Sequence, residues 1–266
     1  MKLSKVLDYT FGGALCLLAV TGSLTSAQTL AAQPADAQFA NNVLLVHGAW
    51  ADGSSWSRVI PRLTTAGLNV VAVQIPLTSL SDDVAATKRA MSLVHGPVLL
   101  VGHSYGGAVI TEAGNDPKVV GLVFVAAFAP DKGESSLSLA TANPTPGGGE
   151  IRQDKSGFLT LTPTGIFDDF AQDLSKAKRT ILNATQVPIA GAALGTPAQN
   201  PSWKNKPTWF VIAANDRAVS PELEAMEAAR MNATTITVPT SHVAMLADPE
   251  RIARFIMRAA GASDER

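Results

Sequence analysis

Short apolar runs alternate with longer amphipathic stretches from residue 42 onward. The runs at 43–46, 68–73, 98–101 and 119–125 predict strands, and the stretches between them space their apolar positions as helices do. The run at 119–125 has no polar side chain, which indicates a strand buried on both faces. This alternation is typical of the α/β class, with a mostly parallel central sheet and helices on both of its faces.

Two helices are predicted between the first three strands. Residues 54–66 place their apolar positions on one face, although Pro61 predicts a kink because proline disturbs a helix interior. Ser81 and Asp82 suit the cap of a second helix over residues 83–94, since short polar side chains satisfy the free N–H groups of a first turn.

The alternating pattern lapses between about residues 131 and 205, which are rich in Gly, Pro, Thr and Ser. Only residues 166–184 predict a helix there. A segment of this length exceeds an ordinary loop, so we expect a cap insertion over the sheet. Regular order then resumes with strands at 208–213 and 234–238 and helices at 221–230 and 249–258.

The composition favours one globular domain, which we place at residues 42–262. The chain has 266 residues, a formal net charge of −1 and 16% charged residues. That length is sufficient for a single large core. The near-neutral charge gives no electrostatic basis for a nucleic acid or an anionic membrane surface as partner.

The N-terminal region has the layout of a signal peptide. Lys2 and Lys5 precede an apolar run at residues 11–24, and the small residues that follow predict cleavage after Ala27. Residues 28–41 then form a leader, and the protein is expected to be exported, either periplasmic or secreted. An uncleaved anchor is the alternative, but the run is shorter than the roughly 20 residues of a spanning helix. No stable membrane insertion is therefore expected after cleavage.

A candidate nucleophile stands directly after the third predicted strand. Gly102-x-Ser104-x-Gly106 lies between that strand and a helix, the context that makes this short motif informative. A turn this sharp tolerates only minimal side chains beside the serine. It exposes the hydroxyl at the edge of the sheet, with a helix N-terminus directed at the site.

A serine hydroxyl needs a base to remove its proton, and the chain has four histidines. His103 lies inside the turn, His47 follows the first strand, where it suits a bond to loop backbone, and His95 ends a helix. His242 is the one histidine after Ser104, as the order serine, acid, histidine requires. We therefore predict His242 as the base.

The acid of such a triad fixes the histidine tautomer and stabilises the imidazolium. Asp216 follows the strand at 208–213 and is the predicted acid. Asp131, which follows the preceding strand, remains the alternative. Asp248 suits the N-cap of the last helix better.

An oxyanion hole needs two backbone N–H donors aimed at the developing charge. Tyr105, the residue after the nucleophile, is expected to supply one. Ala49, in the loop after the first strand, is expected to supply the other. The side chains of Tyr105 and Trp50 either line the pocket or pack in the core, and aromatic residues of the insertion (Phe158, Phe167, Phe170 and Trp203) are candidates for its roof.

These motifs together resemble the α/β-hydrolase superfamily over about residues 42 to 260. They are His47-Gly48-Ala49-Trp50, Gly102-His103-Ser104-Tyr105-Gly106-Gly107, Asn215-Asp216-Arg217 and Ser241-His242. Within the superfamily, the chain looks like bacterial esterase-like members related to plant methylesterases and hydroxynitrile lyases. The resemblance implies an eight-stranded type of sheet, a triad at its carboxyl edge and a cap. The lyases of that branch have a threonine and a lysine where this chain has Gly48 and Val243, which argues against lyase chemistry.

The sequence therefore predicts a serine hydrolase that cleaves a small or medium carboxylic ester through an acyl-enzyme on Ser104. No cofactor is expected, and no cluster of His, Asp or Glu has the spacing of metal ligands. Hydrolysis of an amide, lactone or thioester, or peracid formation, by the same triad remains an alternative. A catalytically silent binding protein on this fold is another.

Overall fold

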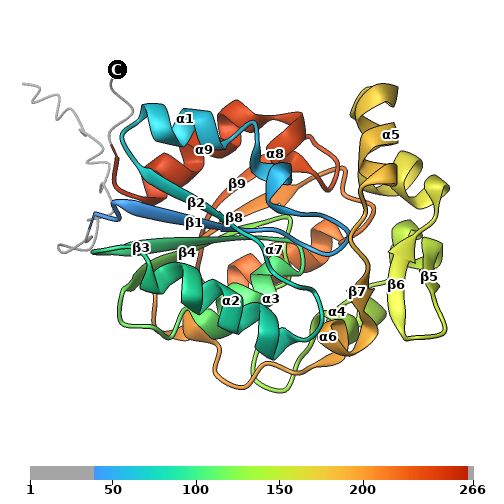
Figure 1. The fold of residues 1–266 in the computed structure, drawn as a ribbon, viewed down its shortest axis with the longest axis horizontal. Coiled ribbons are helices and arrows are strands. Elements are labelled where there is room, and N and C mark those ends of the chain that lie inside the picture. The colour runs from blue at the N-terminus through green and yellow to red at the C-terminus, as the bar shows by residue number, and fades with distance from the viewer. Residues whose placement is uncertain (1–38, 263–266) are drawn as a thin grey trace, which may run out of the picture. The chain divides into compact units, whose positions relative to one another are not determined.

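Six strands form one parallel sheet in this computed structural model, which describes residues 39–262. The sheet order is β2-β1-β3-β4-β8-β9, and every pair of neighbours runs parallel (Figure 1). The strands are β1 (Asn42–Val46), β2 (Asn69–Val73), β3 (Val98–His103), β4 (Val119–Val125), β8 (Thr208–Ala213) and β9 (Thr234–Val238). The predicted α/β class is confirmed, although this sheet has six strands and not the eight that the resemblance implied.

Helices cover both faces of the sheet and bury two apolar layers against it (Figure 1). On one face lie α2 (Leu80–Ser92), α3 (Gly106–Ala113) and α7 (Pro221–Arg230); on the other lie α1 (Ile60–Thr65), α8 (Ala244–Ala247) and α9 (Pro249–Ala259). Strand β4 is almost wholly buried between the two layers. The lack of polar side chains in this valine-rich strand predicted burial on both faces, and the structure confirms it.

Two predicted helices differ from the structure at their starts. In place of one kinked helix over residues 54–66, a 3-10 turn, η1 (Gly53–Trp56), precedes α1, and Pro61 lies in the first turn of α1. Proline is tolerated there because the first turn needs no N–H partner. Helix α2 begins at Leu80 and is capped by Ser79, not by Ser81, because the Ser79 hydroxyl accepts the Asp82 N–H at 3.0 Å.

The insertion contains more regular structure than the single helix predicted there. It forms a small antiparallel sheet and several short helices, drawn mostly in yellow and orange in Figure 1. The predicted helix at 166–184 is divided: a π-helical turn, η3 (Gly165–Phe170), is followed by a break and then by α5 (Lys176–Ala184). The remaining elements are α4 (Ser136–Ala142), η2 (Pro146–Glu150), β5 (Ile151–Gln153), β6 (Phe158–Leu161), β7 (Ile189–Ala190), α6 (Gly191–Gly195) and η4 (Ser202–Lys204).

The fold reaches a little further toward the N-terminus than the predicted domain boundary. Ala40 is buried, and its N–H donates to the carbonyl of Ala260 at 3.1 Å, which ties the start of β1 to the end of α9. The predicted signal peptide at 1–27 and the leader up to residue 38 lie outside the described residues. Within residues 39–262, no helix has both the length and the apolar character needed to cross a membrane.

Helix α7 buries two carboxyl groups, Glu224 and Glu227, against the sheet. Glu227 Oε1 accepts the Ala129 N–H at 2.9 Å, and the Arg230 guanidinium lies 3.7 Å away. Burial nevertheless raises the pKa of Glu227 to about 8, because desolvation disfavours the charged form.

This burial predicts a specific loss of stability as the pH rises. Between about pH 5 and 8 the folded protein holds a proton on Glu227 that the unfolded chain releases, so the free energy of unfolding falls with pH. Glu227→Gln removes this effect and keeps an oxygen for Ala129. Denaturant unfolding at several pH values should show that the free energy of unfolding of the variant, relative to that of the parent, increases by about 1 kcal/mol for each unit of rising pH. A difference in free energy of unfolding that does not change with pH would contradict the raised pKa of Glu227.

Candidate active site

The turn after β3 holds Ser104 in a conformation that depends on its neighbours. Ser104 has φ of 54°, an uncommon region for a residue with a side chain. A Cβ on Gly102 would lie 2.5 Å from the Gly106 carbonyl oxygen, and one on Gly106 would lie 2.6 Å from that of Val46. Both positions therefore require glycine, and the close approach of Gly106 sets the turn against the end of β1.

Asp216 and His242 meet at the carboxyl ends of β8 and β9. His242 Nδ1 lies 2.6 Å from Asp216 Oδ2, and both side chains are buried. The other carboxylate oxygen, Oδ1, accepts the N–H groups of Ala218 and Val219 at 2.7 and 2.9 Å. The acid is thus fixed by its own loop and turned toward the imidazole, which determines the tautomer with the proton on Nδ1.

Ser104 and His242 are both buried, and no direct hydrogen bond joins them among the described residues; the ring of His103, the residue before Ser104, lies 4.6 Å from the His242 ring. His242 Nε2 is buried and has no hydrogen-bond partner among the described residues. The Ser104 side chain lies against Gly48, where an added Cβ would be 3.1 Å from its Oγ. Serine–histidine contacts are often loose until substrate binds, so this geometry is compatible with a nucleophile and its base.

The other two buried histidines bond backbone and not the serine. His47 Nδ1 lies 2.9 Å from the Gly48 carbonyl, and its Nε2 accepts the Ile75 N–H at 3.3 Å. His103 Nε2 lies 3.0 Å from the His242 carbonyl, and the two rings are 4.6 Å apart. Burial lowers the pKa of His47 and, more strongly, that of His103, so both rings are neutral and Nε2 of His103 donates.

Asp131, the alternative acid, and Asp248 both have other partners. Asp131 pairs with Lys204 at 2.5 Å, and its side chain is 30% exposed. Asp248 caps α9 by accepting the Arg251 N–H at 3.2 Å. Neither aspartate bonds His242 within the described part of the chain.

The two predicted oxyanion donors lie on loops that β1 and β3 bring side by side, since Val46 pairs with Gly102. Among the described backbone hydrogen bonds outside helices and strands, neither the Ala49 nor the Tyr105 N–H is a donor. The Tyr105 side chain packs in the core and donates to Asp83 at 2.7 Å, so it does not line a pocket. This bond anchors the residue whose N–H is the candidate donor.

Trp50 joins the loop after β1 to the insertion. Its φ is 59°, and its indole N–H donates to the Leu159 carbonyl of β6 at 3.0 Å. Its ring meets Phe170 edge-on at 6.2 Å, and Phe170 lies 4.9 Å from the His242 ring. Of the four aromatic candidates for the roof, Phe170 thus contacts His242, the predicted base. Trp203, by contrast, bonds the Pro130 carbonyl.

Three polar contacts fasten the segment from Asp169 to Asp173 to the loops that carry Asp216 and His242. Asp169 pairs with Arg217 at 2.7 Å, and Gln172 donates to the Asn215 carbonyl at 2.7 Å. Asp173 accepts both the N–H and the hydroxyl of Ser241, at 2.7 and 2.6 Å. None of these residues was predicted from the sequence. Their only signal in the sequence is the acidic run around the π-helical turn, which does not indicate which residues they bond.

Asp173 is therefore expected to support the position of His242 through Ser241. Asp173→Ala removes both acceptors, so kcat should fall by about threefold to tenfold, the range of one or two partly exposed hydrogen bonds. Asp168→Ala is the matched control, since Asp168 is exposed on the same segment. Equal kcat values for the two variants in a chromogenic ester assay would show that Asp173 has no such role.

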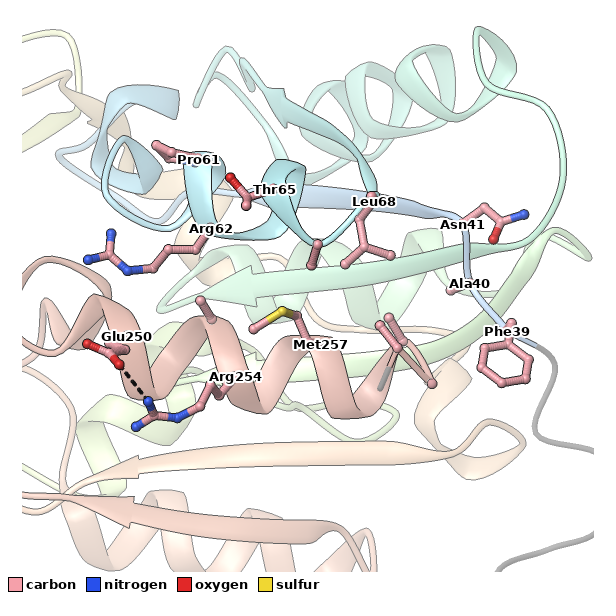
Figure 2. Close-up of a pocket in the computed structure, with 16 residues that line it drawn as sticks. Phe39, Ala40, Asn41, Pro61, Arg62, Thr65, Leu68, Glu250, Arg254 and Met257 are labelled. Atoms are coloured by element: carbon pink, nitrogen blue, oxygen red, sulfur yellow. Dashed lines mark hydrogen bonds and ion pairs between the residues drawn. The ribbon is translucent and has the colours of Figure 1, made fainter. Parts of the chain in front are cut away.

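The three predicted catalytic side chains are enclosed. Ser104, Asp216 and His242 are 4%, 5% and 1% exposed. A groove of about 280 Å³ lies between η1, α5 and α8; Trp50 and Leu246 line it, and none of the three predicted catalytic residues does. A second groove, of about 760 Å³, runs between α1 and α9 at the amino ends of β1 and β2 (Figure 2). None of the residues lining it belongs to the candidate site.

The space around Gly48 bears on lyase chemistry. A Cβ at this position would lie 2.6 Å from the Cβ of Ser104, which is closer than such atoms approach. The threonine that the lyases of the resembling branch have here does not fit this backbone. Val243, where they have lysine, is buried and brings no charge to the site.

Comparisons with known proteins agree with this architecture. Residues 43–255 match a model described as the alpha/beta hydrolase family. The chain is 26% identical over 246 residues to a probable hydrolase, R7, from Phoma sp., covering 82% of this chain and 98% of that protein. It is 34% identical over 114 residues to a carbendazim hydrolyzing esterase from Nocardioides sp., covering 37% of this chain and 46% of that esterase.

A solved structure shares the fold over most of its length. A pyrethroid hydrolase from Sphingobium faniae superposes with a TM-score of 0.74 at 20% identity, covering 85% of this chain and 99% of the hydrolase. At this identity the likeness concerns the fold alone. Together with the match over residues 43–255, it confirms the resemblance to the α/β-hydrolase superfamily that the sequence motifs indicated.

Proposed function

The chain belongs to the alpha/beta hydrolase family, and on that premise we propose that it is a serine hydrolase acting on a small or medium carboxylic ester. The observation that carries the proposal is the 2.6 Å contact between the buried side chains of His242 and Asp216, together with the strained turn that holds Ser104 after β3. Family membership supports a hydrolase, and relatives with hydrolase and esterase names support an ester as substrate.

The proposed reaction proceeds through two acyl transfers. His242 Nε2 takes the proton of Ser104 as its oxygen attacks the acyl carbon, and the imidazolium then gives that proton to the leaving alcohol. Water, activated by the same nitrogen, releases the acid from the acyl-enzyme. Asp216 holds the ring through Nδ1 and stabilises its transient charge.

The negative charge of each tetrahedral intermediate needs donors that do not reorganise. The N–H groups of Ala49 and Tyr105 have this role in the proposal, together with the N-terminus of α3. The Tyr105–Asp83 bond and the indole bond of Trp50 keep the two loops in place. A donor of this kind is worth about 3 kcal/mol in the transition state.

The enclosure of the site supports a substrate of limited size. Ser104 and His242 are almost fully buried, so an ester needs an approach through the surrounding elements. We propose the groove lined by Trp50, Leu182 and Leu246 as the approach, since Trp50 follows the predicted oxyanion donor Ala49 and packs on Phe170, which contacts His242. Its apolar side chains suit the hydrocarbon part of an ester.

A panel of p-nitrophenyl esters from acetate to decanoate tests the proposal, with the matched p-nitroanilides as the amide series. We expect hydrolysis of the short esters, with kcat/KM falling toward the long acyl chains, and slower cleavage of the anilides. Faster turnover of anilides would identify an amidase. No turnover of any ester or anilide by a folded sample would contradict a serine acyl hydrolase.

We further propose that the working enzyme is exported after removal of residues 1–27. The charged start and the apolar run at 11–24 support this. Expression of the full chain in a bacterial host, followed by N-terminal sequencing of the protein from the periplasm and medium, should yield Gln28. An intact Met1 on protein held in the membrane would contradict cleavage.

A further inference from the structure

Glu224 of α7 is a buried carboxyl group that the proposed mechanism does not use. The residue is 0% exposed. Its Oε2 accepts the Ala213 N–H at 2.9 Å, at the end of β8. Its Oε1 is buried and has no hydrogen-bond partner among the described residues. A buried polar atom without a partner costs free energy, so this oxygen calls for an explanation.

The acidic neighbours of Glu224 include the triad acid itself. Glu224 Oε2 accepts the Ala213 N–H, and the Asp216 N–H donates to the Ala213 carbonyl at 3.0 Å, so both acidic residues bond the same residue at the end of β8. Glu227 lies about one turn further along α7, and the negative charges of Asp216 and Glu227 both raise the pKa of Glu224. The ion pairs of Arg230 go to Glu227 and Glu134. Among the described ion pairs none involves Glu224, so no cation offsets a charge there.

Two carboxylates cannot both be ionised in such a site at low cost. Asp216 has the better support for a charge, because two N–H groups and His242 bond its oxygens. Glu224 has a single N–H donor. Burial and the nearby Asp216 charge raise the pKa of Glu224 well above its usual range. The shared proton therefore belongs on Glu224.

We propose that Glu224 is a positioning residue, which stays protonated and donates its Oε1 hydrogen to the carboxylate of Asp216. This bond satisfies the unpaired oxygen and gives Asp216 a fourth donor, so that every acceptor position of the carboxylate is filled. It also keeps one negative charge, and not two, behind His242. The inference rests on the proposed function, because it assigns Asp216 as the triad acid.

Three variants separate this role from an ionised or a merely structural Glu224. Glu224→Gln keeps an oxygen for Ala213 and an N–H donor for Asp216. Glu224→Leu fills the space and removes both. Glu222→Gln is the matched control, because Glu222 is exposed on the same helix and lies outside the site.

The kinetic readouts are kcat, KM and the pH profile of kcat/KM. We expect Glu224→Gln to leave the acid limb of the profile where the parent has it and to lower kcat by less than about threefold, because a neutral group replaces a neutral group. Glu224→Leu should lower kcat by about tenfold with little change in KM, the effect of one lost hydrogen bond to a charged group. Glu222→Gln should change none of the three.

Two results of the same experiments would contradict a protonated Glu224 that supports Asp216. If Glu224 were ionised, Glu224→Gln would remove a negative charge near the imidazole and shift the acid limb down by about 1 pH unit. A parent-like kcat in Glu224→Leu would show that Asp216 needs no donor there. Either result would overturn the proposal.

A titration of the His242 ring by proton NMR makes the same comparison without turnover. The proposal predicts the same midpoint in the parent and in Glu224→Gln, whereas an ionised Glu224 predicts a lower midpoint in the variant. A protein that hydrolyses no ester would contradict the proposed function, while the NMR midpoints would still decide the protonation state of Glu224.

Discussion

Ser104→Ala is expected to lower kcat/KM for a p-nitrophenyl ester by at least about 10⁴-fold, because the reaction then has no nucleophile to form the acyl-enzyme. The remaining rate would come from binding and from the amides of Ala49 and Tyr105. The backbone strain at Ser104, with φ of 54°, is unchanged by alanine, so the variant should fold as the parent does.

His242→Ala provides the internal check on this expectation. Its loss should be of similar size, and the double variant should be no slower than either single one, because the two residues act as a unit. Initial rates at saturating and limiting ester measure the three variants. Losses that multiply in the double variant would show that Ser104 and His242 act independently and would contradict the proposed acyl transfer.

Asp216→Asn is expected to lower kcat by about 10⁴-fold, whereas Asp131→Asn should leave it within about twofold. Asparagine at 216 offers its oxygen to Ala218 and Val219 and turns its NH₂ toward His242, which favours the wrong tautomer. Asp131 pairs with Lys204 at a partly exposed position, where a neutral amide costs little.

The pH dependence of the two variants decides whether Asp216 or Asp131 is the acid. Rates between pH 6 and 9 should show the loss in Asp216→Asn at every pH. A fast Asp216→Asn enzyme together with a slow Asp131→Asn enzyme would assign the acid to Asp131, in the loop after β4. Circular dichroism of both proteins excludes misfolding as the cause.

The sequence predicts the central strands well because they are buried and continuous. Strands β4 and β8 have the predicted bounds, since a run of valine, isoleucine and phenylalanine between turn residues has few other stable arrangements. Strand β9 has them too, although it lies at the edge of the sheet and most of its residues are not buried. The glycines beside Ser104 are equally informative, because contacts of 2.5 and 2.6 Å exclude any Cβ at Gly102 and Gly106.

The insertion was harder to predict because its contacts determine its structure. The helix expected over residues 166–184 has the right apolar spacing, but Asp169, Gln172 and Asp173 bond loops more than 40 residues away. Those bonds accompany a π-helical turn and a break where the pattern alone favours a regular helix. π-Helical turns are frequent at functional sites, and this one places Phe170 on His242.

The candidate site likewise contains residues that the sequence predicts and residues that it does not. Chain order and turn chemistry select Ser104, Asp216 and His242, and the structure brings the last two together. The surrounding residues follow from three-dimensional contacts alone. Glu224 has the spacing of an ordinary helix residue, and its burial beside Asp216 emerges only when α7 packs under β8. The role of Asp83 is likewise visible only in the structure, where it accepts a hydrogen bond from the Tyr105 hydroxyl.

The most direct test of the central claim is to find which residue a fluorophosphonate labels in the folded protein. Peptide mapping by mass spectrometry should place one adduct on Ser104, with labelling lost in Ser104→Ala and strongly slowed in Asp216→Asn. An adduct on another serine, or a folded enzyme that hydrolyses esters while Ser104 stays unmodified, would contradict an acyl-enzyme at this position.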